Sequence, residues 1–90
     1  MSTMQFDEFV RDVDAAVREA ATVAAFEGPT QTQARWETRG REATVELAPP
    51  RNVSVTLAGA AETPATTWYP IDAALVPVVS RRIAGHLGEA

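Results

Sequence analysis

The sequence has 90 residues and a formal net charge of −4, and hydrophobic residues make up 46% of it. This length fits one small domain spanning residues 1–90, and the hydrophobic content is too high for a disordered chain. The chain contains no Cys, which excludes a disulfide and a cysteine-ligated metal site. All eight basic residues are Arg.

The first predicted element is an amphipathic helix over residues 4–27. Ser2 and Gln5 predict a capping box at its start. Gly28-Pro29 predicts its end, because glycine adopts the left-handed cap conformation and proline cannot continue a helix. The apolar residues recur at three- and four-residue spacing and form one stripe, which comprises Phe6, Phe9, Val10, Val13, Val17, Ala20 and Ala24.

Period-two alternation then predicts three strands, over residues 32–38, 42–47 and 53–57. In the first strand, Trp36 falls on the apolar face. The turns between the strands are predicted by the Gly in Arg39-Gly40-Arg41 and by Pro-Pro in residues 48–52. We expect these strands to form an antiparallel meander whose two exposed edges are residues 33–38 and 53–58.

The rest of the chain predicts a small-residue loop at 58–65, a short fourth strand or extended lead-in at 66–69, and a last helical region. Pro77 predicts that this region divides into a short turn at 72–75, capped by Asp72, and a main helix from Pro77, or bends there. The expected fold class is α+β, a two-layer sandwich of order α-β-β-β-(β)-α. Its antiparallel meander sheet carries both helices on one face.

Residue types that carry out most enzyme chemistry are scarce. His86 is the single histidine, and no Gly-rich phosphate loop occurs. We therefore expect no catalytic residue, no cofactor, no metal site and no enzymatic activity. No apolar run reaches the roughly 18 residues of a membrane span, and the N-terminal residues do not resemble a secretory signal. We accordingly expect a cytoplasmic protein that does not contact membranes.

Five residues are candidate partner contacts: Arg35, Arg39, Arg41, Trp68 and Tyr69. The arginines fall on the predicted hairpin, and residues 29–59 carry four Arg against three Glu. Residues 1–28 carry two Arg against six acidic residues, so charge is polarised along the chain. Trp68 and Tyr69 are adjacent in an extended stretch and should face opposite ways. An exposed aromatic of this kind is a typical interface anchor.

From these observations we predict a small non-enzymatic protein–protein interaction module, or a structural subunit of a larger assembly, that associates with itself or with another protein. A core of this size is marginally stable alone. Open strand edges could join two copies, as could contact between the acidic first helix of one copy and the Arg hairpin of another.

Two alternatives remain open. The first is a nucleic-acid-associated regulator that uses the Arg35/Arg39/Arg41 hairpin, although an acidic chain without Lys lacks the basic field that such binding needs. The second is a small-ligand pocket lined by Trp68, Tyr69 and His86.

Overall fold

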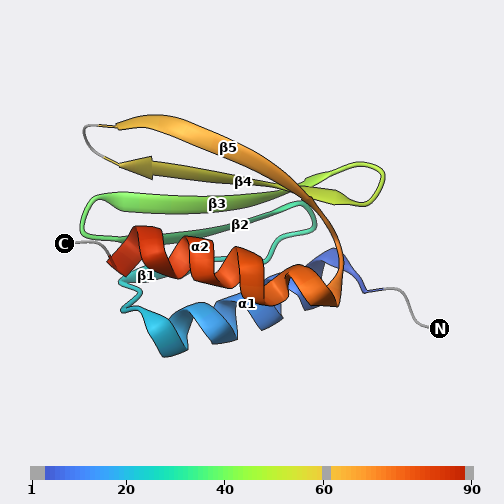
Figure 1. The fold of residues 1–90 in the computed structure, drawn as a ribbon, viewed down its shortest axis with the longest axis horizontal. Helices are drawn as coiled ribbons and strands as arrows, with labels where there is room; N and C mark the ends of the chain where they lie inside the picture. Colours follow the sequence, from blue (N-terminus) through green and yellow to red (C-terminus); the bar gives the residue numbers. More distant parts are fainter. Residues whose placement is uncertain (1–3, 60–61, 89–90) are drawn as a thin grey trace.

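A computed structural model, which describes residues 4–59 and 62–88, shows a sheet of five strands with two helices on one of its faces (Figure 1). The strands are antiparallel and follow the order β1-β2-β3-β4-β5. This confirms the predicted α+β class, the meander and the single helix-covered face. The elements in chain order are α1 (Phe6–Ala20), β1 (Ala25–Glu27), β2 (Gln33–Thr38), β3 (Arg41–Ala48), β4 (Asn52–Gly59), β5 (Glu62–Pro70), the 3-10 turn η1 (Ala73–Leu75) and α2 (Val76–Gly88).

The hydrophobic core lies between the inward face of the sheet and the two helices. Alternate residues of β2, β3 and β4 point into it, as the period-two pattern predicts. The strands contribute Ala34, Trp36, Ala43, Val45, Val53 and Val55, and the helices contribute Phe6, Phe9, Val10, Val13, Val17, Val79, Ile83 and Leu87.

The first helix is shorter than predicted. α1 ends at Ala20, after which the backbone becomes extended, and β1 pairs with β2. Phe26 lies opposite Trp36 in this pairing, with ring centroids 5.1 Å apart. The predicted helix over residues 4–27 is therefore wrong beyond residue 20, because packing of Phe26 on the sheet outweighs the helix propensity of the alanine-rich segment.

At its other end, α1 begins at Phe6, and its N-cap is Gln5 without a side-chain capping bond. The predicted capping box depends on Ser2, which lies outside the described residues.

The sheet is also wider than predicted, so its edges are different strands. Residues 58–65, predicted as a loop, belong largely to β4 and β5, since Leu57 pairs with Ala65 and Gly59 with Glu62. The backbone N–H and C=O groups of a residue can form these pairs whatever its side chain is. The predicted edges, residues 33–38 and 53–58, are consequently interior. The true edges are the three-residue β1 and the nine-residue β5.

The last helical region divides as predicted. The Asp72 side chain accepts a hydrogen bond from the Ala74 N–H at 2.9 Å and caps η1. Pro77 is the second residue of α2, where a missing N–H costs no helical hydrogen bond. Within the described residues, no helix has the length and apolar character needed to cross a membrane.

Gly28 follows β1 with φ +108°, and a Cβ atom there would lie 2.9 Å from the carbonyl oxygen of Gln33. We expect Gly28→Ala to lower the free energy of unfolding by about 1–3 kcal/mol, because neither the backbone conformation nor the space suits a side chain.

Gly85→Ala is the control, since open space surrounds Gly85 in α2. Alanine's higher helix propensity predicts a gain of up to about 1 kcal/mol there. Urea unfolding followed by circular dichroism measures both variants, and equal losses would contradict this account of Gly28.

Candidate functional site

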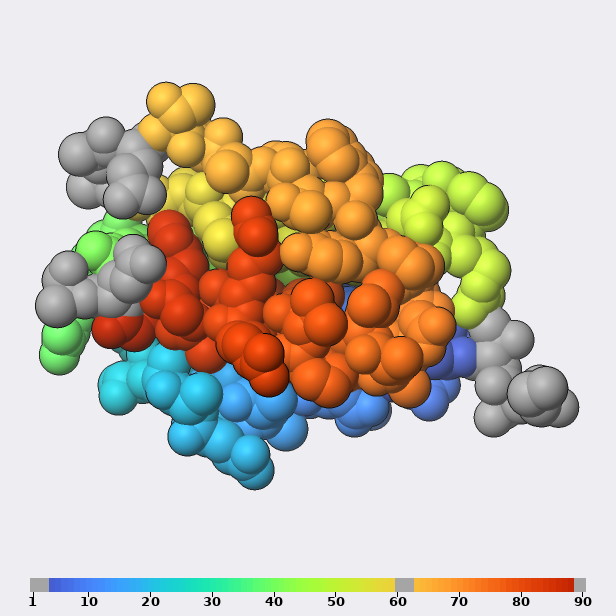
Figure 2. Space-filling model, in the orientation of Figure 1, coloured from blue at the N-terminus to red at the C-terminus, as the bar shows by residue number. Residues whose placement is uncertain are grey.

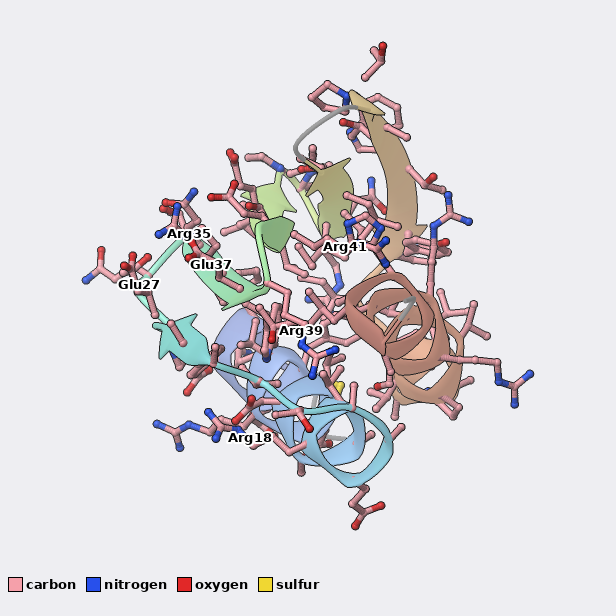
Figure 3. The ribbon with its side chains drawn as sticks, turned by 90° about the vertical axis from the view of Figure 1, so that its left-hand side faces the viewer. Arg18, Glu27, Arg35, Glu37, Arg39 and Arg41 are labelled. Atoms are coloured by element: carbon pink, nitrogen blue, oxygen red, sulfur yellow. The ribbon has the colours of Figure 1, made fainter. Side chains whose placement is uncertain are left out.

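Arg35 lies within a cluster of carboxylates on the outward face of the sheet. Its guanidinium nitrogens are 3.3 Å from Glu27, 3.6 Å from Glu37 and 3.0 Å from Glu42. These glutamates come from β1, β2 and β3, and Glu37 stands directly opposite Glu42. Figure 3 shows Arg35 beside Glu27 and Glu37. The positive charge of Arg35 is therefore balanced within its own chain and relieves the repulsion between opposed carboxylates.

The other two arginines of the hairpin lie elsewhere (Figure 3). Arg41 pairs with the buried Thr38 on the inward side, and its Nη1 donates to the carbonyl oxygen of His86 at 3.1 Å. Arg39 occupies the two-residue turn with φ +51°, beside Gly40 at φ +78°. Such angles are typical of a tight hairpin. The three candidate arginines thus occupy the outward face, the turn and the inward face, rather than one continuous surface.

His86 is held against the sheet. Its Nε2 lies 2.9 Å from the carbonyl oxygen of Ala58, so the end of α2 is tied to β4 as well as to β3 through Arg41. Tyr69 also lies on the inward side, where it packs against the core. Trp68 faces outward, and these aromatic residues therefore do not line one pocket with His86.

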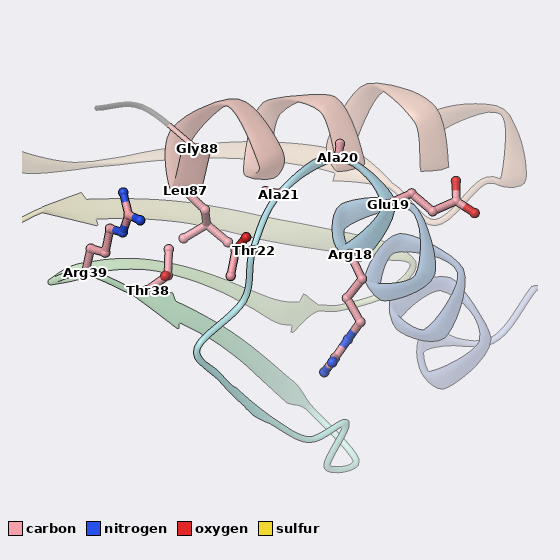
Figure 4. A pocket seen from close by; sticks show the side chains of 9 residues that line it. All are labelled: Arg18, Glu19, Ala20, Ala21, Thr22, Thr38, Arg39, Leu87 and Gly88. Atoms are coloured by element: carbon pink, nitrogen blue, oxygen red, sulfur yellow. The ribbon is translucent and has the colours of Figure 1, made fainter.

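An open pocket of about 400 Å³ lies where the C-terminal ends of both helices approach the β2–β3 turn (Figure 4). Arg18 in its lining is already paired with Asp14 at 2.8 Å. No three His, Asp or Glu side chains among the described residues gather as a metal site requires. The pocket is lined by Arg18, Glu19, Ala20, Ala21, Thr22, Thr38, Arg39, Leu87 and Gly88.

At the sheet edge farthest from β1, no strand or helix of residues 4–59 and 62–88 lies beyond β5 (Figure 1), so its outer edge is free, and it forms the upper rim of the surface in Figure 2. The N–H of Ile71 donates to the carbonyl oxygen of Arg51 at 2.8 Å, in register with the β4–β5 pairing. Residues that bond to the neighbouring strand alternate with residues that do not in an antiparallel ladder. The N–H and C=O groups of Thr66 and Trp68 therefore point away from β4, toward the free edge.

Prolines stand at both ends of this open segment. Pro70 is the last residue of β5. Pro64 lies in a β-bulge, where it and Thr63 together oppose Ala58. A proline has no N–H to donate, and natural edge strands use prolines and bulges to limit pairing. Between the two prolines, the N–H groups that point toward the free edge are those of Thr66 and Trp68.

Trp68 is a large apolar group on this edge. Trp68 is 65% exposed, whereas Tyr69 is half-buried, which confirms that the two side chains face opposite ways. The neighbouring Thr66 hydroxyl lies 2.9 Å from that of Thr56 and forms a hydrogen bond with it. Thr66 and the two prolines are not among the predicted partner contacts, although the β-branched and aromatic run at 66–69 is a signal for an edge strand at this place.

Comparison of the chain with known protein families, curated proteins and solved structures finds no match.

We expect Arg35→Gln to lower the free energy of unfolding by up to about 1 kcal/mol at low salt, because its three glutamate neighbours would then repel one another. High salt should reduce this loss, since it screens exposed charges.

Arg39→Gln removes the same charge but breaks no ion pair found among the described residues, so it should change stability little. Urea unfolding at low and high salt measures both variants. Equal effects would show that only the net charge matters.

Proposed function

We propose that this protein is a non-enzymatic protein–protein interaction module, or a structural subunit of a larger assembly, that self-associates through the free edge of β5. One observation carries this proposal: on a long edge strand, main-chain donors and acceptors that point toward the free edge lie beside the exposed Trp68. Exposed strand edges recruit a further strand through main-chain hydrogen bonds, which set direction and register.

Trp68 supports the proposal energetically. A tryptophan that is 65% exposed can lose on the order of 100 Å² of largely apolar surface to a partner, worth about 2–3 kcal/mol. Large aromatic residues that become buried in this way are the usual hot spots of protein interfaces. Main-chain pairing and aromatic burial would thus act at the same place.

The arginines give less support to the nucleic-acid alternative. Arg35 is balanced by three glutamates, and Arg41 donates to the His86 carbonyl. Nucleic-acid binding draws its affinity from several basic side chains that together release counterions. The same arrangement weakens the idea that the acidic helix of one copy contacts the Arg hairpin of another.

We expect the mass in solution to exceed the 9.7 kDa of a single chain and to rise with protein concentration. Raising the salt concentration from about 50 to about 200 mM should leave this association intact, because main-chain and apolar contacts do not depend on counterion release. Light scattering coupled to size exclusion measures the mass. A constant single-chain mass at every concentration and salt would contradict self-association.

Trp68→Ala should weaken the association at least about tenfold, which corresponds to about 1.4 kcal/mol. Val78→Ala is the control, because Val78 is also a large exposed hydrophobic residue but lies on α2. It should leave the dissociation constant unchanged. Equal weakening by the two substitutions would argue against the β5 edge as the interface.

A further inference from the structure

We infer that the partner of β5 is the β5 strand of a second copy, paired antiparallel about a two-fold axis that passes between the two Thr67 residues. This inference rests on the proposed self-association and adds to it a register and a symmetry.

The main-chain groups that point toward the free edge fit this register. Thr66 of each copy lies opposite Trp68 of the other, and both residues direct their N–H and C=O groups toward the free edge. Opposed residues of this type exchange two hydrogen bonds in an antiparallel ladder. Because the symmetry produces this pair twice, all outward donors and acceptors of Thr66 and Trp68 are satisfied.

The prolines mark the ends of the same register. Two residues beyond each Thr66–Trp68 pair, Pro64 of one copy lies opposite Pro70 of the other, and neither has an N–H to donate. A shift by two residues in one direction would leave the Trp68 N–H to bond to the carbonyl oxygen of Pro64, which lies in the bulge. A shift in the other direction would leave the Thr66 N–H to bond to the carbonyl oxygen of Pro70, at the end of the strand. The register centred on Thr67 uses the regular part of β5 alone.

The charge of this segment favours a second copy as the partner. Residues 63–71 contain no charged residue, although the protein carries a net charge of −4. Edge strands that avoid pairing commonly carry charged side chains, and like charges directly opposite one another destabilise a sheet. Two identical β5 edges meet without such repulsion, whereas a partner recognised by its charge would find no complement here.

The symmetry also places the aromatic rings well. A two-fold axis perpendicular to the sheet keeps both outward faces on the same side. Trp68 of one copy then lies beside Thr66 of the other and diagonal to the second Trp68, at the roughly 7–8 Å that aromatic side chains can span. Pairing therefore covers the sides of both rings that meet at the junction and continues two five-stranded sheets as one.

Thr66→Pro tests the main-chain donors. The Thr66 N–H points away from β4, so proline at this position removes no main-chain bond within the fold, and edge strands tolerate it. Thr66→Val is the matched control, because it also removes the hydroxyl bonded to Thr56 but keeps the N–H.

With circular dichroism showing an unchanged fold, light scattering should give a single-chain mass for the proline variant and the wild-type mass for the valine variant. Wild-type self-association in the folded proline variant would overturn the inference.

Cysteine cross-linking tests the register. In the inferred pairing, the two Thr67 residues face each other as a non-hydrogen-bonded pair with Cα atoms about 4.5 Å apart, within the range for a disulfide. Thr66→Cys is the control, because Thr66 faces Trp68 instead. The chain has no other Cys. Under mild oxidation, Thr67→Cys should form a covalent dimer in several-fold higher yield than Thr66→Cys.

A higher yield for Thr66→Cys would overturn the register. Failure of both variants to cross-link, in a protein that light scattering shows to self-associate, would overturn β5 pairing but leave self-association, and with it the interaction module, standing on another surface. A single-chain mass without cross-linking would overturn both.

Discussion

The buried indole of Trp36 fixes the helical layer against the sheet. An indole N–H inside the fold requires an acceptor, because leaving it without one costs about 1–3 kcal/mol. Asp14 supplies this acceptor at 2.8 Å, and the same carboxylate oxygen accepts from Arg18 at 2.8 Å. Arg18 lies 5.5 Å from the ring centre of Phe26, which packs against Trp36. The contacts among these four side chains hold α1 in place on the sheet and hold β1 against β2.

Because both helices lie on one face, the opposite face must be stable in water. The outward side chains achieve this largely by bonding across strands. Arg35 joins carboxylates from β1, β2 and β3, and the hydroxyls of Thr56 and Thr66 join β4 to β5. These groups satisfy one another within the chain. Trp68 differs from them, since burial of its ring requires something beyond the chain's own edge.

Short-range periodicity was sufficient to predict the meander, the inward placement of Trp36 and the break before the last helix. β1 was missed because residues 21–27 continue the alanine-rich helical pattern, and only the folded sheet offers Phe26 a better position. β5 was predicted too short because residues 58–65 have little intrinsic strand preference, although backbone pairing does not require it. For the candidate site, alternation predicted that the two adjacent aromatics diverge. That Trp68 is the exposed one depends on its register with β4.

The unequal lengths of the two rim strands bear on how far this chain could assemble. β1 is three residues long and has Glu27 bound to Arg35, whereas β5 is nine residues long. Joining two copies at β5 consumes both long rims and leaves a short β1 at each end of the shared sheet. A molecule with two long rims could keep adding neighbours and grow into a fibre. Because β1 is so short, we expect assembly through β5 to stop at a closed dimer.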